Sequence, residues 1–436
     1  MRAVDLIQKK KEGKEHTQEE INFLVENYTK GLIEDYQMSA WLMAVCFQGL
    51  TDKETAYLTK AFIDSGDILD FSEISENIAD KHSTGGVGDK VTIALIPILA
   101  ELGVYTAKLS GRGLGYTGGT IDKLESIPNF KVELSNEEFF NQIKDIKVAI
   151  SSQSPNLTPA DGKIYALRDV TATVDNKSLI CASVVSKKIA SGANSIVLDV
   201  KYGSGAFLKT PQEATELGNL MIKTGKLLNK NIDVIISSME QPLGIAIGNS
   251  LEIIEAIEFL KGNYQEDLYE ITKEIAIKTL LNFDKNLDRT KAQEMFDEVI
   301  KNKKALNKFR EIIKHQKGDP NCVDDYNLFK TSKNKIEIKS DKEGYISELI
   351  ALDVAHCAKL LGAGRDKKSD KIDHSAGIIL KKKVSDKVLK DDTIMELYFD
   401  DVESSKLEHA TKIAENSFKI SSEKIEKPKL IYKSTI

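Results

Sequence analysis

The chain has 436 residues, of which 41% are hydrophobic and 29% charged, as is typical of a globular enzyme with two or three domains. Its 61 Lys and Arg residues against 67 Asp and Glu residues give a net charge of −6, which offers no electrostatic reason to expect nucleic acid or an anionic membrane as a partner. The four cysteines are widely spaced and form no CxxC motif, which disfavours a disulfide framework and a thiolate zinc site.

The first 65 residues are predicted to be helical throughout. Thr17 and Thr51 each begin a capping-box sequence with Glu three residues later, and each leads into apolar residues at helical spacing. These features predict a helical bundle, and apolar residues left exposed on it would be a natural surface for a dimer. The N-terminus lacks the apolar stretch of a signal peptide, and no apolar run is long enough to cross a bilayer, so we expect a cytoplasmic protein.

From about residue 80, short β-rich runs alternate with longer helical patterns, which is typical of an α/β domain with a mostly parallel sheet. The expected strands and helices of this part are strands at 104–109, 147–151, 195–200 and 233–236 and helices at 91–102, 211–229 and 251–260. Residues 158–191 interrupt the alternation with a long helical pattern and no strand.

We therefore predict an α/β protein with three domains. A discontinuous all-helical domain comprises residues 1–66 and 158–192, and a larger α/β domain with a mostly parallel sheet comprises 78–157 and 193–334. Short alternating strands in residues 335–436 predict a C-terminal α+β lobe.

The first of two glycine-rich segments, DKHSTGGVGD at residues 80–89, lies directly before the helix expected from Val91. Glycines before a helix N-terminus let backbone N–H groups converge on an anion, and the helix dipole favours negative charge there. Lys81, Ser83 and Thr92 can supply further donors. A Walker A loop is excluded because its lysine and spacing are not matched. The alternative is a plain βα turn, although Lys, His, Ser and Thr in succession are unusual for one.

The second glycine-rich segment, KLSGRGLGYTGGT at residues 108–120, follows an expected strand. Its GxGxxG pattern formally fits a dinucleotide fingerprint, but that pattern is weak alone, and the long helix it requires is disfavoured by Pro128 soon after. We interpret the segment as a second wall of an anion pocket, with Ser110 and Thr120 as hydroxyl donors.

A third group lies in the long helical stretch. Ser183 and Lys187 are four residues apart, so they share one face of a helix, and Arg168 precedes them. The alternative for these three residues is a salt-bridged helical surface, which composition alone does not reject. For Lys188, a solvated charge is the favoured interpretation.

The segments KHSTGGVGD, SGRGLGYTGGTIDKLE, NLTPAD, YALRDVTATVD and SKKIASGA together resemble the thymidine and pyrimidine-nucleoside phosphorylase family, and the resemblance runs essentially end to end. It implies a homodimer that uses inorganic phosphate as co-substrate and no organic cofactor. Phosphate would bind the α/β domain and the pyrimidine the helical domain, with closure of a cleft bringing them together.

The resemblance also implies roles for individual residues. Phosphate would be held by Lys81, Ser83, Thr92, Lys108, Ser110 and Thr120. The pyrimidine would be held by Arg168, Ser183 and Lys187, with Leu114 and Tyr165 packing near it. His82 would lie beside O2 of the base, and His82, Arg168 and Lys187 would be the catalytic residues.

In this reaction phosphate attacks C1′ of the nucleoside while the glycosidic bond breaks through an oxocarbenium-like state. The pyrimidine leaves as a developing anion, which Arg168 and Lys187 would stabilise in a water-poor cleft. His82 can share its proton with O2, because an imidazole exchanges protons readily near neutral pH. The products would be a free pyrimidine and an α-pentose 1-phosphate.

Lys108 distinguishes two subgroups of the family. A lysine here resembles the broader bacterial enzymes, which accept uridine as well as thymidine and deoxyuridine, whereas the thymidine-restricted enzymes carry methionine. A lysine can reach the phosphate and present a donor near the 2′ side of the sugar. We therefore predict broad specificity, with a thymidine-restricted enzyme as the alternative.

Two positions depart from the family pattern. Tyr116 stands where histidine is usual. Lys90 stands where related bacterial enzymes have a threonine that helps to bind potassium, although the other potassium-binding positions match as Gly88, Leu243, Ala246 and Glu255. We expect the ammonium group of Lys90 to replace potassium and to pair with Glu255. The alternative is that potassium binds as usual and Lys90 points to solvent.

Three other functions are considered. An enzyme similar to anthranilate phosphoribosyltransferase would share the architecture but would need a metal–pyrophosphate site, which these motifs fit less well. A dinucleotide-dependent oxidoreductase rests on the GxGxxG match alone. A dimeric nucleoside-binding protein without turnover would require a missing catalytic group, and the sequence indicates none.

Overall fold

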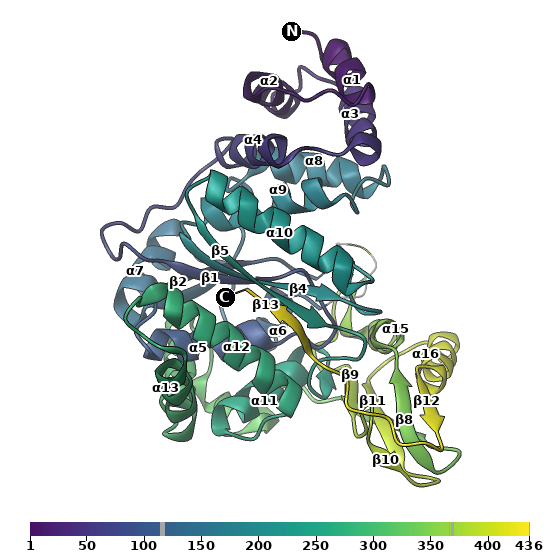
Figure 1. The fold of residues 1–436 in the computed structure, drawn as a ribbon. Coiled ribbons are helices and arrows are strands. Elements are labelled where there is room, and N and C mark those ends of the chain that lie inside the picture. Colours follow the sequence, from purple (N-terminus) through teal and green to yellow (C-terminus); the bar gives the residue numbers. More distant parts are fainter. Residues whose placement is uncertain (114–117, 366, 368–369, 436) are drawn as a thin grey trace. The chain divides into compact units, whose positions relative to one another are not determined.

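The computed structural model describes residues 1–113, 118–365, 367 and 370–435 (Figure 1). Two compact units make up the chain. The first comprises residues 1–80, 153–198 and 215–234, and the second comprises 81–152, 199–214 and 235–436. Among the described residues, no helix combines the length and apolar character that crossing a membrane requires.

The first unit is built mainly of helices, as its N-terminal sequence predicts. These are α1 (Ala3–Lys11), α2 (Gln18–Thr29), α3 (Asp35–Gln48), α4 (Asp52–Ile63), α8 (Pro159–Asp169), α9 (Lys177–Ala190) and most of α10 (Pro211–Leu227). Both predicted capping boxes are confirmed, because the hydroxyls of Thr17 and Thr51 accept a backbone N–H three residues later while the Glu carboxylates accept the N–H of each threonine.

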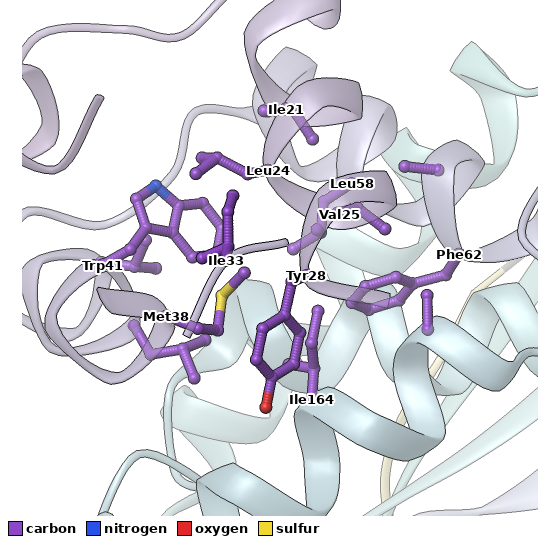
Figure 2. Packing of buried hydrophobic residues seen from close by; sticks show 14 of the residues in the cluster. Ile21, Leu24, Val25, Tyr28, Ile33, Met38, Trp41, Leu58, Phe62 and Ile164 are labelled. Carbon is purple, nitrogen blue, oxygen red and sulfur yellow. The ribbon is translucent and has the colours of Figure 1, made fainter. Parts of the chain in front are cut away.

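The core of the first unit joins helices that are far apart in the sequence. Figure 2 shows Tyr28 of α2, Trp41 of α3, Phe62 of α4 and Ile164 of α8 packed among smaller aliphatic side chains. All four are at most 1% exposed. Since burying one such side chain contributes about 1.5–3 kcal/mol, this shared apolar surface explains why residues 153–198 belong with the N-terminal helices.

A buried polar network ties α1, α3 and α4 together within that unit. The ammonium of Lys10 lies 2.7 Å from Oε1 of Glu54, and both side chains are almost fully buried. Glu54 also accepts the backbone N–H of His16, and Trp41 donates its indole N–H to Nε2 of His16. Burial opposes ionisation of Glu54, but the hydrogen bonds from His16 and Lys10 prevail and lower its pKa.

A six-stranded sheet has the order β13-β5-β4-β1-β2-β3 (Figure 1). Its strands are β1 (Ala79–Ser83), β2 (Thr106–Ser110), β3 (Val148–Ser152), β4 (Ser195–Tyr202), β5 (Asn231–Ser238) and β13 (Ile431–Ser434). Strands β2 and β3 pair in parallel, and β13 pairs antiparallel to β5. The predicted mostly parallel sheet is confirmed, although the sequence did not indicate that the C-terminal strand would join it.

The second unit contains further helices that follow the sheet strands along the chain. They are α5 (Val91–Glu101), α6 (Thr120–Leu124), α7 (Asn136–Ile146), α11 (Asn249–Lys261), α12 (Glu266–Phe283), α13 (Arg289–Lys301) and α14 (Lys304–His315). The brevity of α6 agrees with the expectation that the GxGxxG pattern leads into no long helix.

The predicted C-terminal α+β region is also confirmed. One small sheet has the order β10-β8-β12, from Lys387–Val388, Gly344–Leu349 and Phe418–Ser421. The other has the order β6-β9-β11-β7, from Ala246–Ile247, Gly377–Leu380, Thr393–Phe399 and Asn334–Lys339. Helices α15 (Ala351–Ala358) and α16 (Ser404–Asn416) complete the region.

Candidate active site

The first glycine-rich segment forms a tight loop between β1 and α5. Gly85 and Gly88 have φ values of +100° and +71°, a region that side-chain-bearing residues rarely adopt. A Cβ on Gly86 would lie 2.6 Å from Cε of Met239, so the backbone packs closely against its neighbours. The loop leads directly into the N-terminus of α5, where Thr92 lies in the first turn, an arrangement that suits anion binding.

Lys81 is the most unusual residue beside this loop. Its side chain is 2% exposed, and its ammonium has no hydrogen-bond partner among the described residues. The nearest carboxylate oxygen, Oδ1 of Asp89, lies 3.7 Å away. Burial lowers the pKa of Lys81, partly opposed by Asp89 and Asp199. A buried cation without a hydrogen bond is costly, and an anionic ligand would satisfy it.

Two charged residues near Lys81 were not among the predicted site residues. Lys201 and Asp199 of β4 are fully buried and form an ion pair of 2.7 Å, and Lys201 also donates to the hydroxyl of Ser237. Lys201 lies 4.0 Å from Asp89. Although burial opposes its ionisation, Asp89 has its pKa lowered by Lys81 and Lys201. In the sequence, Asp199 and Lys201 are two residues apart at the end of an expected strand, so they point to the same face of the sheet, and this spacing could have indicated that they pair.

The second glycine-rich segment lies on the neighbouring strand. Lys108 of β2 is buried and donates to the backbone carbonyl of Lys81 over 2.6 Å, so the structure brings these two predicted phosphate ligands together. Ser83 and Ser110 end the adjacent strands β1 and β2, while Thr92 and Thr120 stand in the first turns of α5 and α6.

The remaining predicted residues of these strands are His82 and the central part of the second glycine-rich segment. His82 lies on β1 next to Lys81 and is partly buried. The segment is closed at its base by the carboxylate of Asp122, which accepts the backbone N–H of Gly113 over 2.6 Å. The predicted base contact Leu114 and the departure Tyr116 lie outside the described residues.

The predicted pairing of Lys90 with Glu255 is confirmed. The Lys90 side chain is fully buried, and its ammonium lies 2.6 Å from Oε2 of Glu255. It also donates to the carbonyls of Leu243 and Ala246, both over 2.9 Å. Gly88 is so close that a Cβ there would lie 3.4 Å from this ammonium. Lys90 does not point to solvent, and its three N–H donors have three oxygen partners.

Arg168 stands near the end of α8 in the first unit and is 1% exposed. Its guanidinium donates to three backbone carbonyls over 2.6–3.2 Å, those of Thr173 and Val174 in the segment after α8 and that of Leu179 in the first turn of α9. Burial lowers the pKa of Arg168. Three of its five N–H groups are thus used to hold the segment after α8 and the start of α9.

Ser183 and Lys187 share one face of α9, as predicted, because the ammonium of Lys187 donates to the Ser183 hydroxyl over 2.9 Å. Both side chains converge on Asp161 of α8, a buried residue of the NLTPAD segment that was not among the predicted site residues. The aromatic ring of Tyr165 lies 5.5 Å from the Arg168 guanidinium and 5.7 Å from the Lys187 ammonium. The predicted cationic group is therefore a real cluster with a carboxylate inside it.

The interpretation of Lys188 as a solvated charge is wrong. Its side chain is 2% exposed and pairs with Asp80 over 2.9 Å. Because α9 is buried on several sides, Lys187 and Lys188 both meet buried carboxylates, although they point in different directions from adjacent positions.

A cavity of about 580 Å³ lies elsewhere in the second unit. Its lining includes Asp267, Glu270, Lys383 and Lys427, and among the predicted site residues only Leu243 contributes. Lys81, the first glycine-rich loop and the start of α5 lie outside this cavity, so its lining does not coincide with the predicted phosphate-binding residues.

Sequence comparisons support the class of protein that this fold and these clusters indicate. The glycosyl transferase family matches over its helical bundle domain at residues 4–66 and its α/β domain at residues 75–306. The C-terminal domain of pyrimidine nucleoside phosphorylases matches residues 345–421. Anthranilate phosphoribosyltransferase from Thermus thermophilus is similar in fold, with a TM-score of 0.60 at 15% identity over 72% of this chain and all of that one.

Curated relatives are more specific. A pyrimidine-nucleoside phosphorylase from Geobacillus stearothermophilus is 46% identical over 99% of both chains. Another from Bacillus subtilis is 48% identical over 91% of this chain and 92% of its own length. The chain therefore belongs to the pyrimidine-nucleoside phosphorylase family, as its motifs predicted.

The unsatisfied ammonium of Lys81 leads to a prediction about ligand-induced stability. Inorganic phosphate should raise the melting temperature of the protein relative to chloride at equal ionic strength, because only the folded state binds it. The stabilisation is about 2.7 kcal/mol at a phosphate concentration one hundred times the dissociation constant. Lys81→Met should abolish this response, as measured by differential scanning calorimetry.

The control is Lys10→Met, which removes a buried lysine of the first unit and should leave the phosphate response intact. A Lys81→Met protein that phosphate still stabilises as it does the wild type would contradict the assignment of Lys81 to the anion site.

Proposed function

We propose that this chain catalyses the reversible phosphorolysis of pyrimidine nucleosides, with uridine, thymidine and deoxyuridine as substrates. The observation that carries the proposal is the similarity over 99% of both chains to a relative named for this activity. The products would be the free pyrimidine and an α-(deoxy)ribose 1-phosphate, a reaction of nucleoside salvage. The likeness to anthranilate phosphoribosyltransferase is one of fold alone and supports no second function.

The geometry supports a division of roles between two sets of residues. Lys81, with Ser83, Thr92, Lys108, Ser110 and Thr120 around the glycine-rich loops, would bind phosphate and aim one oxygen at C1′ of the nucleoside. Arg168 and Lys187, with Ser183 and Tyr165, would bind the pyrimidine and stabilise the negative charge that develops on it as the glycosidic bond breaks. His82 would exchange a proton with O2 of the base.

The substrate range follows from Lys108. Free base should be released from both uridine and thymidine, only when phosphate is present, as measured by chromatography of the products. Lys108→Met should reduce kcat/KM for uridine relative to thymidine by at least about tenfold, because a hydrogen bond from a charged donor contributes roughly 1.5–3 kcal/mol.

The matched control for this substitution is Lys131→Met. Lys131 belongs to the same unit but lies outside both glycine-rich segments, and its ammonium pairs with Glu138. Its replacement should leave the ratio of kcat/KM values for the two nucleosides unchanged. Release of base without phosphate would contradict the proposed reaction. Phosphate-dependent release from thymidine alone would keep the reaction but contradict the broad specificity.

Lys90 forms a cluster with Leu243, Ala246 and Glu255, here called the Lys90 clamp. This cluster determines whether the protein needs potassium. Potassium would need the space that the ammonium fills, so the oxygen atoms around it do not fit the ion while Lys90 is among them. A lysine ammonium brings the same single positive charge and satisfies the same oxygen atoms. We therefore propose that Lys90 replaces potassium in this chain.

Activity and melting temperature should be the same in potassium chloride and in tetramethylammonium chloride. Lys90→Thr should make both depend on potassium, because the variant leaves Glu255 buried without its counter-charge. Lys90→Met is the matched control, since it removes the charge and offers the ion no oxygen. Strong potassium dependence of the wild-type enzyme would refute the replacement.

We propose that the chain forms a homodimer through a surface of the first unit. Tyr36, Ala40, Met43 and Phe47 are exposed and recur on one side of α3, with Tyr36 73% and Phe47 80% exposed. Large apolar side chains at such spacing fit a second copy of the same helix face in a two-fold dimer.

The net charge of −6 and the four free cysteines favour a cytoplasmic protein without nucleic-acid or membrane partners.

Analytical ultracentrifugation should show a dimer of the wild-type chain. Phe47→Glu should shift it towards monomer because the substitution places a charge in the apolar contact, whereas Phe207→Glu, at an exposed phenylalanine of the other unit, should not. A monomeric wild-type chain would contradict the proposed dimer.

A further inference from the structure

Asp161 is a buried carboxylate that has no role in the proposed mechanism. It lies in the first turn of α8 and is 0% exposed. Its Oδ2 atom is 2.5 Å from the ammonium of Lys187 and accepts the hydroxyl of Ser183 over 3.1 Å. Its Oδ1 atom is buried and has no hydrogen-bond partner among the described residues. A carboxylate that is buried at this cost, with one oxygen unused, calls for an explanation.

The placement of Asp161 follows from helical spacing. Asp161, Tyr165 and Arg168 stand at positions i, i+4 and i+7 of α8, so they share one face of that helix. Ser183 and Lys187 of α9 meet this face, as the contacts with Asp161 show. The ring of Tyr165 is partly exposed, and the charged groups of Arg168 and Lys187 lie beside it. Asp161 thus sits behind the groups that would touch a pyrimidine.

The charges of this cluster do not cancel. Arg168 and Lys187 bring two positive charges and Asp161 one negative charge. Asp175 adds a weaker field at Arg168, as the lesser causes of its pKa show. Arg168, Lys187 and Asp161 therefore sum to one excess positive charge. The exposed carboxylates of Asp169 and Asp175 act on the cluster more weakly because water screens them. A pyrimidine that leaves its sugar carries one negative charge until it is protonated.

We propose that Asp161 is a positioning residue that fixes the ammonium of Lys187 and limits the excess charge of the pyrimidine-binding cluster to one. The inference rests on the proposed phosphorolysis. Two uncompensated cations would bind the anionic pyrimidine too tightly for release. Without the contact to Asp161, the ammonium of Lys187 would no longer have a fixed position. Asp161 therefore sets how strongly the enzyme prefers an anionic pyrimidine over a neutral one.

Inhibition by two pyrimidines tests this preference. The probes are 5-nitrouracil, whose ring N–H ionises near neutral pH, and thymine, which stays neutral there. Asp161→Asn keeps the shape of the side chain but leaves two excess charges. It should increase the ratio of affinities, 5-nitrouracil over thymine, about tenfold while kcat falls, because an unscreened charge at this range is worth at least that much.

A double-variant cycle separates charge from position. Lys187→Met alone leaves no excess charge and should lower the ratio about tenfold. The double variant Asp161→Asn, Lys187→Met restores a single excess charge and should bring the ratio back to that of the wild type, although kcat stays low. Removing both partners of a buried pair is also better tolerated than removing one, so this variant tests the proposal even where Asp161→Asn folds poorly.

The matched control is Glu54→Gln, which breaks the buried pair with Lys10 in the same unit. It should lower the melting temperature but leave the ratio of affinities unchanged. An unchanged ratio in Asp161→Asn, with only a loss of thermal stability, would overturn the proposal. A wild-type protein that releases no pyrimidine from any nucleoside would contradict the proposed function itself.

Discussion

The arrangement of the first glycine-rich loop and the start of α5 depends on the hydrogen bonds and the ion pair of the buried Lys90 ammonium. Lys90 stands between the glycine-rich loop and α5, and its three donors reach two carbonyls of residues 243–246 and the carboxylate of Glu255. That carboxylate in turn accepts the backbone N–H groups of Ile245 and Ala246. Because every donor and acceptor is satisfied, two buried charges are tolerated, and the start of α5 is held to the chain that enters α11.

This completeness contrasts with the neighbouring lysine. Lys81 is as deeply buried as Lys90 but lacks a hydrogen-bonded partner among the described residues. Native proteins rarely leave such a group unsatisfied, and a bound ion is one way in which the missing partner is supplied. The same contrast recurs in the first unit, where Glu54 is fully engaged and Asp161 keeps one oxygen unused. In each unit, one buried charged group has hydrogen-bond partners for all its polar atoms, and another keeps a polar atom without one among the described residues.

Local patterns in the sequence were sufficient for the elements and for part of the site. Capping boxes located α2 and α4, apolar runs located strands β2 to β5, and glycines before a helix indicated the anion loop. Long-range pairings were not visible in the same way. Lys188 looks like a surface lysine until its partner Asp80 is known, and Asp161 looks like an ordinary helix-start residue. The partner of Lys90 was foreseen through the family pattern, since no spacing rule joins two positions so far apart in the chain.

The antiparallel pairing of β13 with β5 has a consequence for how the chain is made. Ile431 to Ser434 cover the outer edge of β5, where Ile235 and Ile236 would otherwise present unpaired backbone groups. During synthesis at about 5–20 residues per second, β5 is made long before β13, because α11 to α16 and the strands between them lie in the intervening chain. The edge of β5 therefore stays open to pairing with other chains until β13 has been synthesised and has paired with it.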